Sequence, residues 1–459
     1  MLSPADVVAV HEAALRVLEH TGVLVQDDEA VALLCARGAR ADGRRLFIGE
    51  GVVQAALAAA PSAFTLHGRS PARDVRFGGG CAVFGSCSGP AFVLDGDRVR
   101  PGTLADLEAT IKLGHVSSVI EFHGDSVELL DLPEEERTRR GAHARVVLSD
   151  KACEWVATTD ADLDVAAAVH EVLYGAAWHD RPRGLIILNT TSPLQISAET
   201  ARLLVRWARL GQPTCATACL MGGTTGPATP AGVLVVQHAE VLAALVLAQA
   251  AAEGSPFIYG GLSTMASLRT GAAHFGTPEF ARMAMASVQL AHHCGLPVRA
   301  GAAVTDAHLP DAQAATESLQ GVAGALRAGS DFLFQGAGIL SSFNTLSLEK
   351  FVLDDEMLTA QRALGEPLSA GADDFAEDVT AAVGPGGSYL STRHTRRHAR
   401  DHDRLTFLAR DAPERWSSSG GADARQAAAG EVARRLEAFI PPDDLDPMVR
   451  RQLGELCIA

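Results

Sequence analysis

The stretch that decides the fold runs from Pro213 to Gly261 and reads PTCATACLMGGTTGPATPAGVLVVQHAEVLAALVLAQAAAEGSPFIYGG. Short apolar runs with strand character stand at its two ends, at 213–219 and 256–261. Between them lies a long apolar segment with helical character, 230–253. A strand, a helix and a second strand in this order predict two parallel strands joined by a crossover helix.

The same alternation extends from Gly80 to about residue 364. Strands are expected in eight runs: 82–86, 119–124, 153–159, 183–190, 213–219, 256–261, 297–303 and 331–338. Helices are expected at 103–114, 130–146, 162–178, 197–210, 230–253, 278–294, 311–328 and 347–364. This pattern predicts an α/β fold, a (β/α)₈ TIM barrel. A doubly wound sheet is the alternative, but GGGCAVFG does not match the glycine fingerprint that such a sheet usually carries after its first strand.

The chain is expected to divide into three parts. Residues 1–75 hold helical patterns and a short hairpin, and predict a mostly helical N-terminal cap. Residues 76–370 form the barrel, which is the expected catalytic domain, and 371–459 form a C-terminal helical extension.

Composition limits the classes of function. Of the 459 residues, 47% are hydrophobic and 20% are charged, which predicts a large core. A net charge of −16 argues against a nucleic-acid partner. The eight cysteines form no CxxC pair and are interpreted as reduced thiols of a cytoplasmic protein, with no metal site. Gln237, His238, Glu240 and Gln249 interrupt the apolar segment 230–253, so it is expected to be a buried helix and not a membrane span.

Proton-handling groups gather in AGAAVTDAHLPDAQAATES, residues 300–318, where a predicted strand ends. Asp306 has no capping role there and is the expected catalytic residue, because barrel sites form at the carboxyl ends of strands. Asp311 follows Pro310, so it either caps the next helix or binds substrate. The other expected substrate-binding residues of this stretch are His308, Gln313 and Glu317.

A second group lies in YGGLSTMASLRTGAAHFGTPEF, residues 259–280. Arg269 could clamp a carboxylate or fasten a long loop, and Glu279 could bind substrate or complement a helix dipole after Thr277 and Pro278. The candidates from this group and from the last strand are Tyr259, Arg269, His274, Phe275, Glu279 and Gln335.

His394, His398 and His402 stand at i, i+4 and i+8, a spacing that can present metal ligands on one helix face. The arginines between them favour a solvated or docking helix instead. The chain has no Walker loop, no H-E-x-x-H, no G-x-S-x-G and no D-x-H-x-x-G cobalamin-binding pattern.

An ordered set of motifs spans nearly the whole chain: SPLQISAET, MGGTTGPATPAG, RTGAAHFGTPEF, TDAHLPDAQAATE, GAGILSSFNTLSLEKFVLDDEML and GPGGSYLSTRHTRRH. In this order they resemble the trimethylamine methyltransferase family, in its branch without pyrrolysine that includes glycine betaine methyltransferases.

The resemblance implies a TIM barrel that moves a methyl group from a betaine-like quaternary amine to the Co(I) of a corrinoid (cobalamin) carried by a separate partner protein. No corrinoid would be bound covalently to this chain, and a homo-oligomer is expected. Asp306 with Tyr259 or Phe275 would hold the cation, and Arg269 or His308 would meet a betaine carboxylate. The chain departs from the family pattern at Ala266, Ala307, His308, Ser341 and Ser342, near the expected barrel mouth.

Two alternatives stay open. The methyl group could pass to another acceptor, such as a tetrahydrofolate or a thiol. The barrel could also bind quaternary amines without catalysing the methyl transfer.

Overall fold

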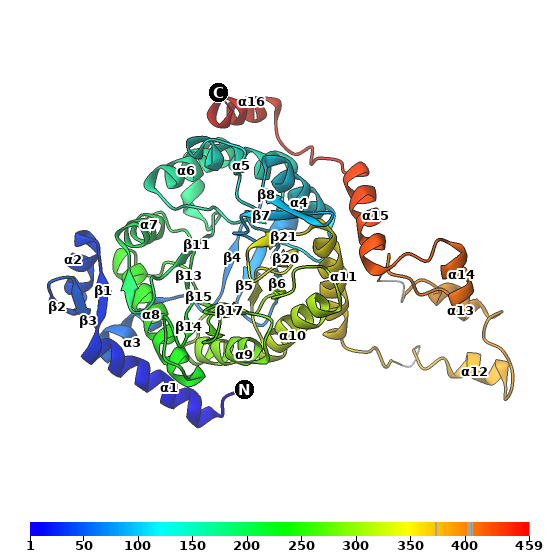
Figure 1. Cartoon of the computed structure of the whole chain (residues 1–459), viewed down its shortest axis with the longest axis horizontal. Helices are drawn as coiled ribbons and strands as arrows, with labels where there is room; N and C mark the ends of the chain where they lie inside the picture. The colour runs from blue at the N-terminus through cyan, green and yellow to red at the C-terminus, as the bar shows by residue number, and fades with distance from the viewer. Residues whose placement is uncertain (372–373, 402–404, 406, 459) are drawn as a thin grey trace.

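The computed structural model describes residues 1–371, 374–401, 405 and 407–458. Within these residues, eight parallel strands are surrounded by eight helices (Figure 1). The strands are β6 (Val83–Phe84), β9 (Phe122–His123), β10 (Ala152–Cys153), β11 (Ile186–Asn189), β13 (Thr214–Ala218), β15 (Phe257–Gly261), β18 (Val298–Ala300) and β19 (Phe332–Leu333). The helices are α4 (Leu104–Val116), α5 (Glu134–Leu148), α6 (Asp160–Tyr174), α7 (Ala198–Arg209), α8 (Pro230–Ala251), α9 (Pro278–His293), α10 (Ala312–Ala328) and α11 (Leu348–Leu364).

The eight strands follow one another in a ring. Six of them form one parallel sheet in the order β11-β13-β15-β18-β19-β6, and β9 and β10 form a second. Isolated parallel bridges join the two sheets, from Gly85 to Phe122 at one edge and from Glu154 to Leu185 at the other. Among the described residues these contacts are single bridges and not ladders, so the observed pairing is an α/β parallel arrangement without a continuous eight-stranded ladder.

One end of the ring is filled by an apolar hairpin. This hairpin, β4 (Phe64–Leu66) and β5 (Val75–Phe77), enters at the end where the strands begin. The ring of Phe77 lies 5.0 Å from that of Phe332 and 6.4 Å from that of Phe122, measured between centroids. Burial of these aromatic side chains closes that end, so a ligand has to enter from the opposite end.

Two small sheets stand at the end where the parallel strands finish. One consists of β14 (Met221–Gly222), β16 (Thr264–Ala266) and β17 (Ala273–His274). The other consists of β20 (Ile339–Leu340), β21 (Thr345–Leu346), β7 (Phe92–Asp95) and β8 (Arg98–Pro101). All of these strands come from loops that follow parallel strands, so they frame the mouth of the ring.

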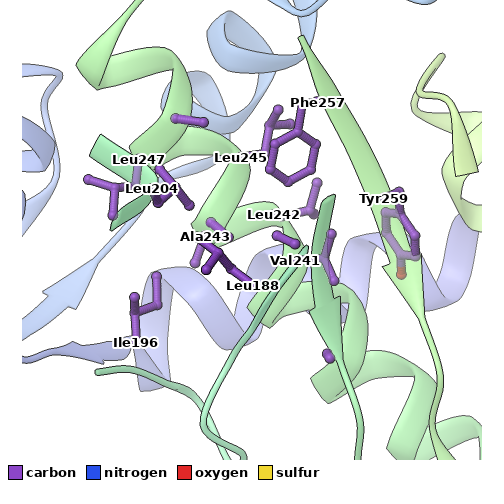
Figure 2. Packing of buried hydrophobic residues seen from close by; sticks show 14 of the residues in the cluster. Leu188, Ile196, Leu204, Val241, Leu242, Ala243, Leu245, Leu247, Phe257 and Tyr259 are labelled. Atoms are coloured by element: carbon purple, nitrogen blue, oxygen red, sulfur yellow. The ribbon is translucent and has the colours of Figure 1, made fainter. Parts of the chain in front are cut away.

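Helix α8 is the most buried helix of the ring. By length and composition it could cross a membrane, but most of it is buried inside this fold. Figure 2 shows Val241, Leu242 and Leu245 of α8 packed with Phe257 of β15. The helix begins at Pro230, and Thr229 caps it by accepting a hydrogen bond from the Gly232 amide. The sequence-based interpretation of 230–253 as a buried helix is therefore confirmed.

The first residues pack against α8 and α9. They form α1 (Pro4–Arg16), the π-helical turn η1 (Val17–Thr21), β1 (Val23–Val25), α2 (Asp28–Ala36), β2 (Arg40–Asp42), β3 (Arg45–Phe47) and α3 (Glu50–Ala59). Strand β1 pairs in parallel with β12 (Gln195–Ile196), which lies in the loop between β11 and α7.

The last residues carry further helices: α12 (Glu377–Val383), α13 (Arg393–His398), α14 (Pro413–Ser418), α15 (Ala424–Glu437) and α16 (Pro447–Cys457). Helix α15 packs on α4 and α11, and α16 packs on α5 and α6. Helices α12 to α14 project away from the ring (Figure 1).

Seven of the eight predicted strand runs contain one of the eight parallel strands, and the run 153–159 overlaps β10 only at Cys153. Each predicted helical stretch corresponds to one ring helix. The prediction of an α/β fold with parallel strands is confirmed.

Candidate active site

Asp306 lies just after β18 and is half-buried. Its Oδ1 accepts hydrogen bonds from the Phe275 amide at 2.9 Å and from the Ser342 hydroxyl at 2.6 Å. Its Oδ2 accepts one from the Gly276 amide at 3.1 Å. The carboxylate therefore ties the segment after β17 to the turn between β20 and β21, on the side of the mouth where the neighbouring strands β15, β18 and β19 end.

Glu317 of α10 supports Asp306 from behind. Its Oε2 accepts from the Asp306 amide at 2.9 Å and from the Thr305 hydroxyl at 2.5 Å, and its Oε1 accepts from the Gln313 side chain at 2.9 Å. Gly276 leaves room for this carboxylate, since a Cβ at that position would lie 2.1 Å from Oε2 of Glu317. Asp306, Glu317 and Gln313 thus form one hydrogen-bonded group, here called the mouth cluster.

Three more predicted residues lie beside the mouth cluster. The buried ring of Phe275 packs edge-on against Phe343 at 4.7 Å between centroids. The carbonyl oxygen of His274 accepts a hydrogen bond from the Thr264 hydroxyl at 2.5 Å. The ring of His308 is exposed, and its Nδ1 lies 2.8 Å from the Ser341 hydroxyl.

Four predicted residues are placed elsewhere. Tyr259 points away from the ring interior, into the layer of side chains that faces α8 (Figure 2). Its hydroxyl lies 3.1 Å from Nδ1 of His238, and burial raises the pKa of the phenol. Arg269 is exposed, and Glu279 is exposed in the first turn of α9, where a carboxylate complements the helix dipole. Asp311 caps α10 by accepting a hydrogen bond from the Ala314 amide at 3.1 Å, so the capping interpretation is confirmed.

His394 and His398 lie on α13 with ring centroids 4.5 Å apart. Nδ1 of His398 lies 2.6 Å from the Asp401 carboxylate, on the exposed surface. His402, the third histidine of the pattern, lies outside the described residues.

The interior of the ring holds two buried charges that sequence reasoning missed, Glu154 and Arg299. Glu154 follows β10, and its carboxylate is hydrogen-bonded to the Ser88 side chain. Arg299 is on β18, where Nη1 lies 3.3 Å from the Thr217 hydroxyl and the guanidinium carbon lies 5.6 Å from the centre of the Phe334 ring. The two groups influence each other electrostatically, yet no salt bridge within 4.0 Å joins them in the described structure.

Each of these two side chains keeps unused hydrogen-bonding capacity. Oε2 of Glu154 and Nε of Arg299 have no hydrogen-bond partner among the described residues. Burial raises the pKa of Glu154 from its usual 4.5 to about 7, although the Ser88 hydrogen bond opposes this shift. Burial also lowers the pKa of Arg299, which nevertheless keeps its charge at neutral pH. Unsatisfied charged atoms in a buried interior are costly and are typical of ligand sites.

Gln335 belongs to this interior group and not to the mouth cluster. It is buried, and its side-chain oxygen accepts a hydrogen bond from the Ser88 amide at 2.9 Å. Its φ of +66° is the left-handed conformation, which side chains other than glycine seldom adopt. Gln335 therefore positions Ser88, the partner of Glu154. Glu154, Arg299, Ser88 and Gln335 are called the interior cluster below.

The sequence carried a signal for the two missed residues. Both are single charges inside short apolar strand runs, in CEWVATT and in PVRAGAA. A charge within a strand that is buried on both faces has to point into a polar cavity or toward a partner.

A cavity of about 680 Å³ lies outside the ring, between α10, α11 and C-terminal residues that include Leu405, Leu408 and Arg410. Its walls are mainly apolar, and the Lys350 ammonium inside it is already paired with Asp354 at 2.5 Å. The buried ammonium of this cavity is thus already neutralised, whereas Glu154 and Arg299 keep polar atoms without a partner among the described residues, and we place the candidate site inside the ring.

Comparison with known proteins gives the family. The model of the family described as trimethylamine methyltransferase (MTTB) matches residues 1–458. The chain belongs to the trimethylamine methyltransferase family. It is 32% identical over 459 residues to the glycine betaine methyltransferase of Desulfitobacterium hafniense (strain Y51), covering 99% of this chain and 95% of that protein. It is 31% identical over 461 residues to the proline betaine:corrinoid methyltransferase of Eubacterium limosum, covering 96% of this chain and 94% of that protein.

Among solved structures, the chain is similar to the monomethylamine methyltransferase of Methanosarcina barkeri. That similarity has a TM-score of 0.46 and 10% identity, over 95% of this chain and 93% of the other. The family resemblance inferred from the sequence motifs is thus confirmed by the family model and by the sequence relatives.

Proposed function

We propose that the protein transfers a methyl group from a betaine, a quaternary ammonium ion that also carries a carboxylate, to a corrinoid held by a separate protein. Membership of the trimethylamine methyltransferase family and the names of the two relatives, which mention glycine betaine and proline betaine, support this proposal. The observation that carries the choice of substrate is the buried, unpaired combination of Glu154 and Arg299.

A betaine is a zwitterion, and the interior cluster offers one charge for each of its ends. The Glu154 carboxylate would face the quaternary nitrogen, and the Arg299 guanidinium would receive the carboxylate as a charge-assisted hydrogen-bond donor. The Phe334 ring beside Arg299 adds an aromatic surface for the N-methyl groups. Because a quaternary ammonium has no N–H to donate, Oε2 of Glu154 can remain without a hydrogen bond and still be neutralised by the ligand.

The protein's residues would orient the substrate and exclude water. The buried setting strengthens the attraction between each charge and its partner, and Ser88 with Gln335 fixes the carboxylate. No group has to protonate the departing amine, since its nitrogen keeps the electron pair of the broken C–N bond. A corrinoid, when its carrier docks, supplies a strong nucleophile that takes up the methyl group without a proton.

The exposed residues at the mouth are compatible with docking of such a carrier protein. Asn189, Thr191 and Cys219 are exposed at the ends of β11 and β13. The mouth cluster lies elsewhere around the rim. There, Asp306 would act as a positioning residue that holds the two small sheets together. Phe275, His274 and His308 lie along the same rim.

The wider architecture of the protein belongs to this proposal. The ring of strands would be a closed (β/α)₈ barrel, with residues 1–75 as a cap, 76–370 as the catalytic barrel and 371–459 as an extension. The two single bridges that join the sheets and the ring of helices support the barrel. The enzyme would act in the cytoplasm as a homo-oligomer.

The test is turnover with a free cofactor. Purified protein is incubated with glycine betaine and chemically reduced cobalamin, while methylcobalamin absorbance and dimethylglycine are followed together. We expect both products in equal amounts. Binding of glycine betaine by calorimetry without either product would favour the non-catalytic binding barrel. Dimethylglycine formed only when tetrahydrofolate or a thiol replaces cobalamin would favour the other acceptors.

A further inference from the structure

A cluster of metal-binding side chains lies on the outer side of β15, away from the ring interior. It joins His11 of α1, His238 of α8 and Cys294, the residue that ends α9. Nδ1 of His11 lies 2.9 Å from Nε2 of His238. The sulfur of Cys294 lies 3.8 Å from the first nitrogen and 3.9 Å from the second.

These distances are close to the ligand–ligand distances of a tetrahedral coordination shell. With Zn–N bonds of about 2.0 Å and Zn–S bonds of about 2.3 Å, ligand atoms around zinc stand roughly 3.3 to 3.6 Å apart. The three observed separations bracket that range, so an ion would fit between the three atoms after shifts of about half an ångström. His11 and His238 are buried and Cys294 is half-buried, which leaves a path for an ion to enter beside Cys294.

A hydrogen-bonded outer shell holds His238 in place. The Tyr259 hydroxyl lies 3.1 Å from its Nδ1 and 3.4 Å from the side-chain nitrogen of Gln237. That nitrogen in turn donates to the Ser287 hydroxyl at 2.8 Å. Metal-binding histidines usually use their second ring nitrogen in this way, which orients the ring and fixes the tautomer whose other nitrogen binds the ion.

We propose that His11, His238 and Cys294 bind a zinc ion. Two imidazoles and a thiolate are the ligands that zinc prefers, whereas magnesium and calcium need oxygen ligands that this cluster does not include. The fourth position would be taken by water or by His293, whose ring centroid lies 5.0 Å from that of His11. The bound ion would cross-link α1 to α8 and α9, and thereby fix the N-terminal cap on the ring.

This site is independent of the proposed methyl transfer, because it lies on the opposite side of β15 from the interior cluster. A zinc ion here would overturn the expectation, drawn from the sequence, that the chain holds no metal. The three ligands are separated by 227 and 56 residues, so no local spacing pattern could reveal them. The fold brings them together.

The experiment measures zinc in the full-length protein, prepared without an affinity tag that binds metals. After treatment with excess zinc and gel filtration in metal-free buffer, we expect about one zinc per chain by mass spectrometry of the elements. Cys294→Ser and His238→Asn should each lower this content about tenfold or more, because each removes a ligand. Cys35→Ser, which replaces an exposed thiol on α2, is the matched control and should keep the wild-type content.

Cobalt substitution identifies the ligands without relying on activity. The cobalt(II) form, prepared without any corrinoid, should show a thiolate-to-cobalt charge-transfer band that Cys294→Ser removes while circular dichroism stays unchanged. A chelator should lower the melting temperature of the wild type but not that of Cys294→Ser. A wild-type protein without zinc after reloading would overturn the proposal, and so would a Cys294→Ser variant that retains the wild-type zinc content. Copper in place of zinc would also overturn it.

Discussion

Glu154 and Arg299 are both buried inside the ring of parallel strands, and each keeps a polar atom without a hydrogen-bond partner in the described chain. Opposite charges that are buried in one interior usually form a direct ion pair, because each unpaired buried charge costs several kcal/mol. Here the Ser88 side chain holds the carboxylate and Thr217 holds the guanidinium. The arrangement keeps the two charges available for a zwitterionic ligand.

Glu154→Gln should weaken glycine betaine binding by roughly 100-fold, because the amide cannot neutralise a buried quaternary ammonium. The affinity of the wild type should also rise with pH through about 7, where Glu154 loses its proton. The variant should lose this pH dependence. Isothermal titration calorimetry between about pH 6 and pH 8 measures both effects. In this range, the dependence of the binding enthalpy on the buffer reports the proton that is released on binding.

The control for this experiment is Glu121→Gln, which makes the same chemical change in a partly exposed carboxylate paired with Arg362. Its betaine affinity should match that of the wild type. Equal affinity in the wild type and Glu154→Gln would remove Glu154 from the site.

Arg299→Gln should alter substrate choice more than it alters the affinity for the ammonium group. We expect about 10- to 100-fold weaker binding of glycine betaine, since a charge-assisted contact to the carboxylate is lost. Choline has the same quaternary nitrogen but no carboxylate. It should bind the wild type more weakly than glycine betaine does, and the Arg299→Gln substitution should change its affinity little. Competition assays with both ligands test this, and a parallel loss for both would contradict the assignment of Arg299 to the carboxylate.

The fold could be predicted from the sequence, whereas the inward-facing residues could not. In a parallel sheet that is covered by helices, both faces of a strand are buried. The residues of both faces are therefore apolar, and the sequence does not show which of them point inward. In β15, Ile258 faces the ring interior and Tyr259 faces α8, yet both are buried. The prediction that Tyr259 holds the substrate depended on this parity, which a single sequence does not contain. Arg299 and Glu154 stand out as single charges in apolar runs, but the face of the strand that each one occupies is hidden in the same way.

The mouth cluster was easier to predict, because the polar residues of a loop stand out in the sequence where an apolar strand run ends. The grouping of Asp306, Glu317 and Gln313 was expected from residues 300–318, and the structure brings these three together. Their hydrogen bonds to the amides of Phe275 and Gly276 could not be foreseen, since they depend on how two distant loops meet.

Asp306→Asn should loosen the mouth of the ring. An amide nitrogen cannot accept from the Gly276 amide, so at least one charge-assisted hydrogen bond is lost, at a cost of about 2 kcal/mol. We expect faster proteolysis between residues 267 and 276 and a lower kcat. Asp311→Asn is the matched control, because asparagine caps a helix as well as aspartate does. If both variants resist protease like the wild type, Asp306 does not hold the loop.

Gly276→Ala tests the close approach of the Gly276 backbone to Glu317. The new Cβ would lie 2.1 Å from Oε2 of Glu317, so the carboxylate would have to leave the Asp306 amide and the Thr305 hydroxyl. We expect a loss of stability of about 2 kcal/mol or more. Gly430→Ala, in open space on α15, should instead stabilise its helix slightly. Thermal melting of the two variants should therefore shift in opposite directions.

Burial of Glu154 should also make stability depend on pH with a defined sign. Its pKa is higher in the folded protein, about 7, than the usual 4.5, so between these values the folded state binds more protons than the unfolded state. Stability then falls as pH rises through this window, and the penalty is complete above about 7.

Glu154→Gln mimics the protonated acid and should escape the penalty. The melting temperature of the variant minus that of the wild type should therefore grow from about pH 5 to about pH 8, while every other titrating group cancels in the difference. A constant difference across this range would show that Glu154 does not titrate there.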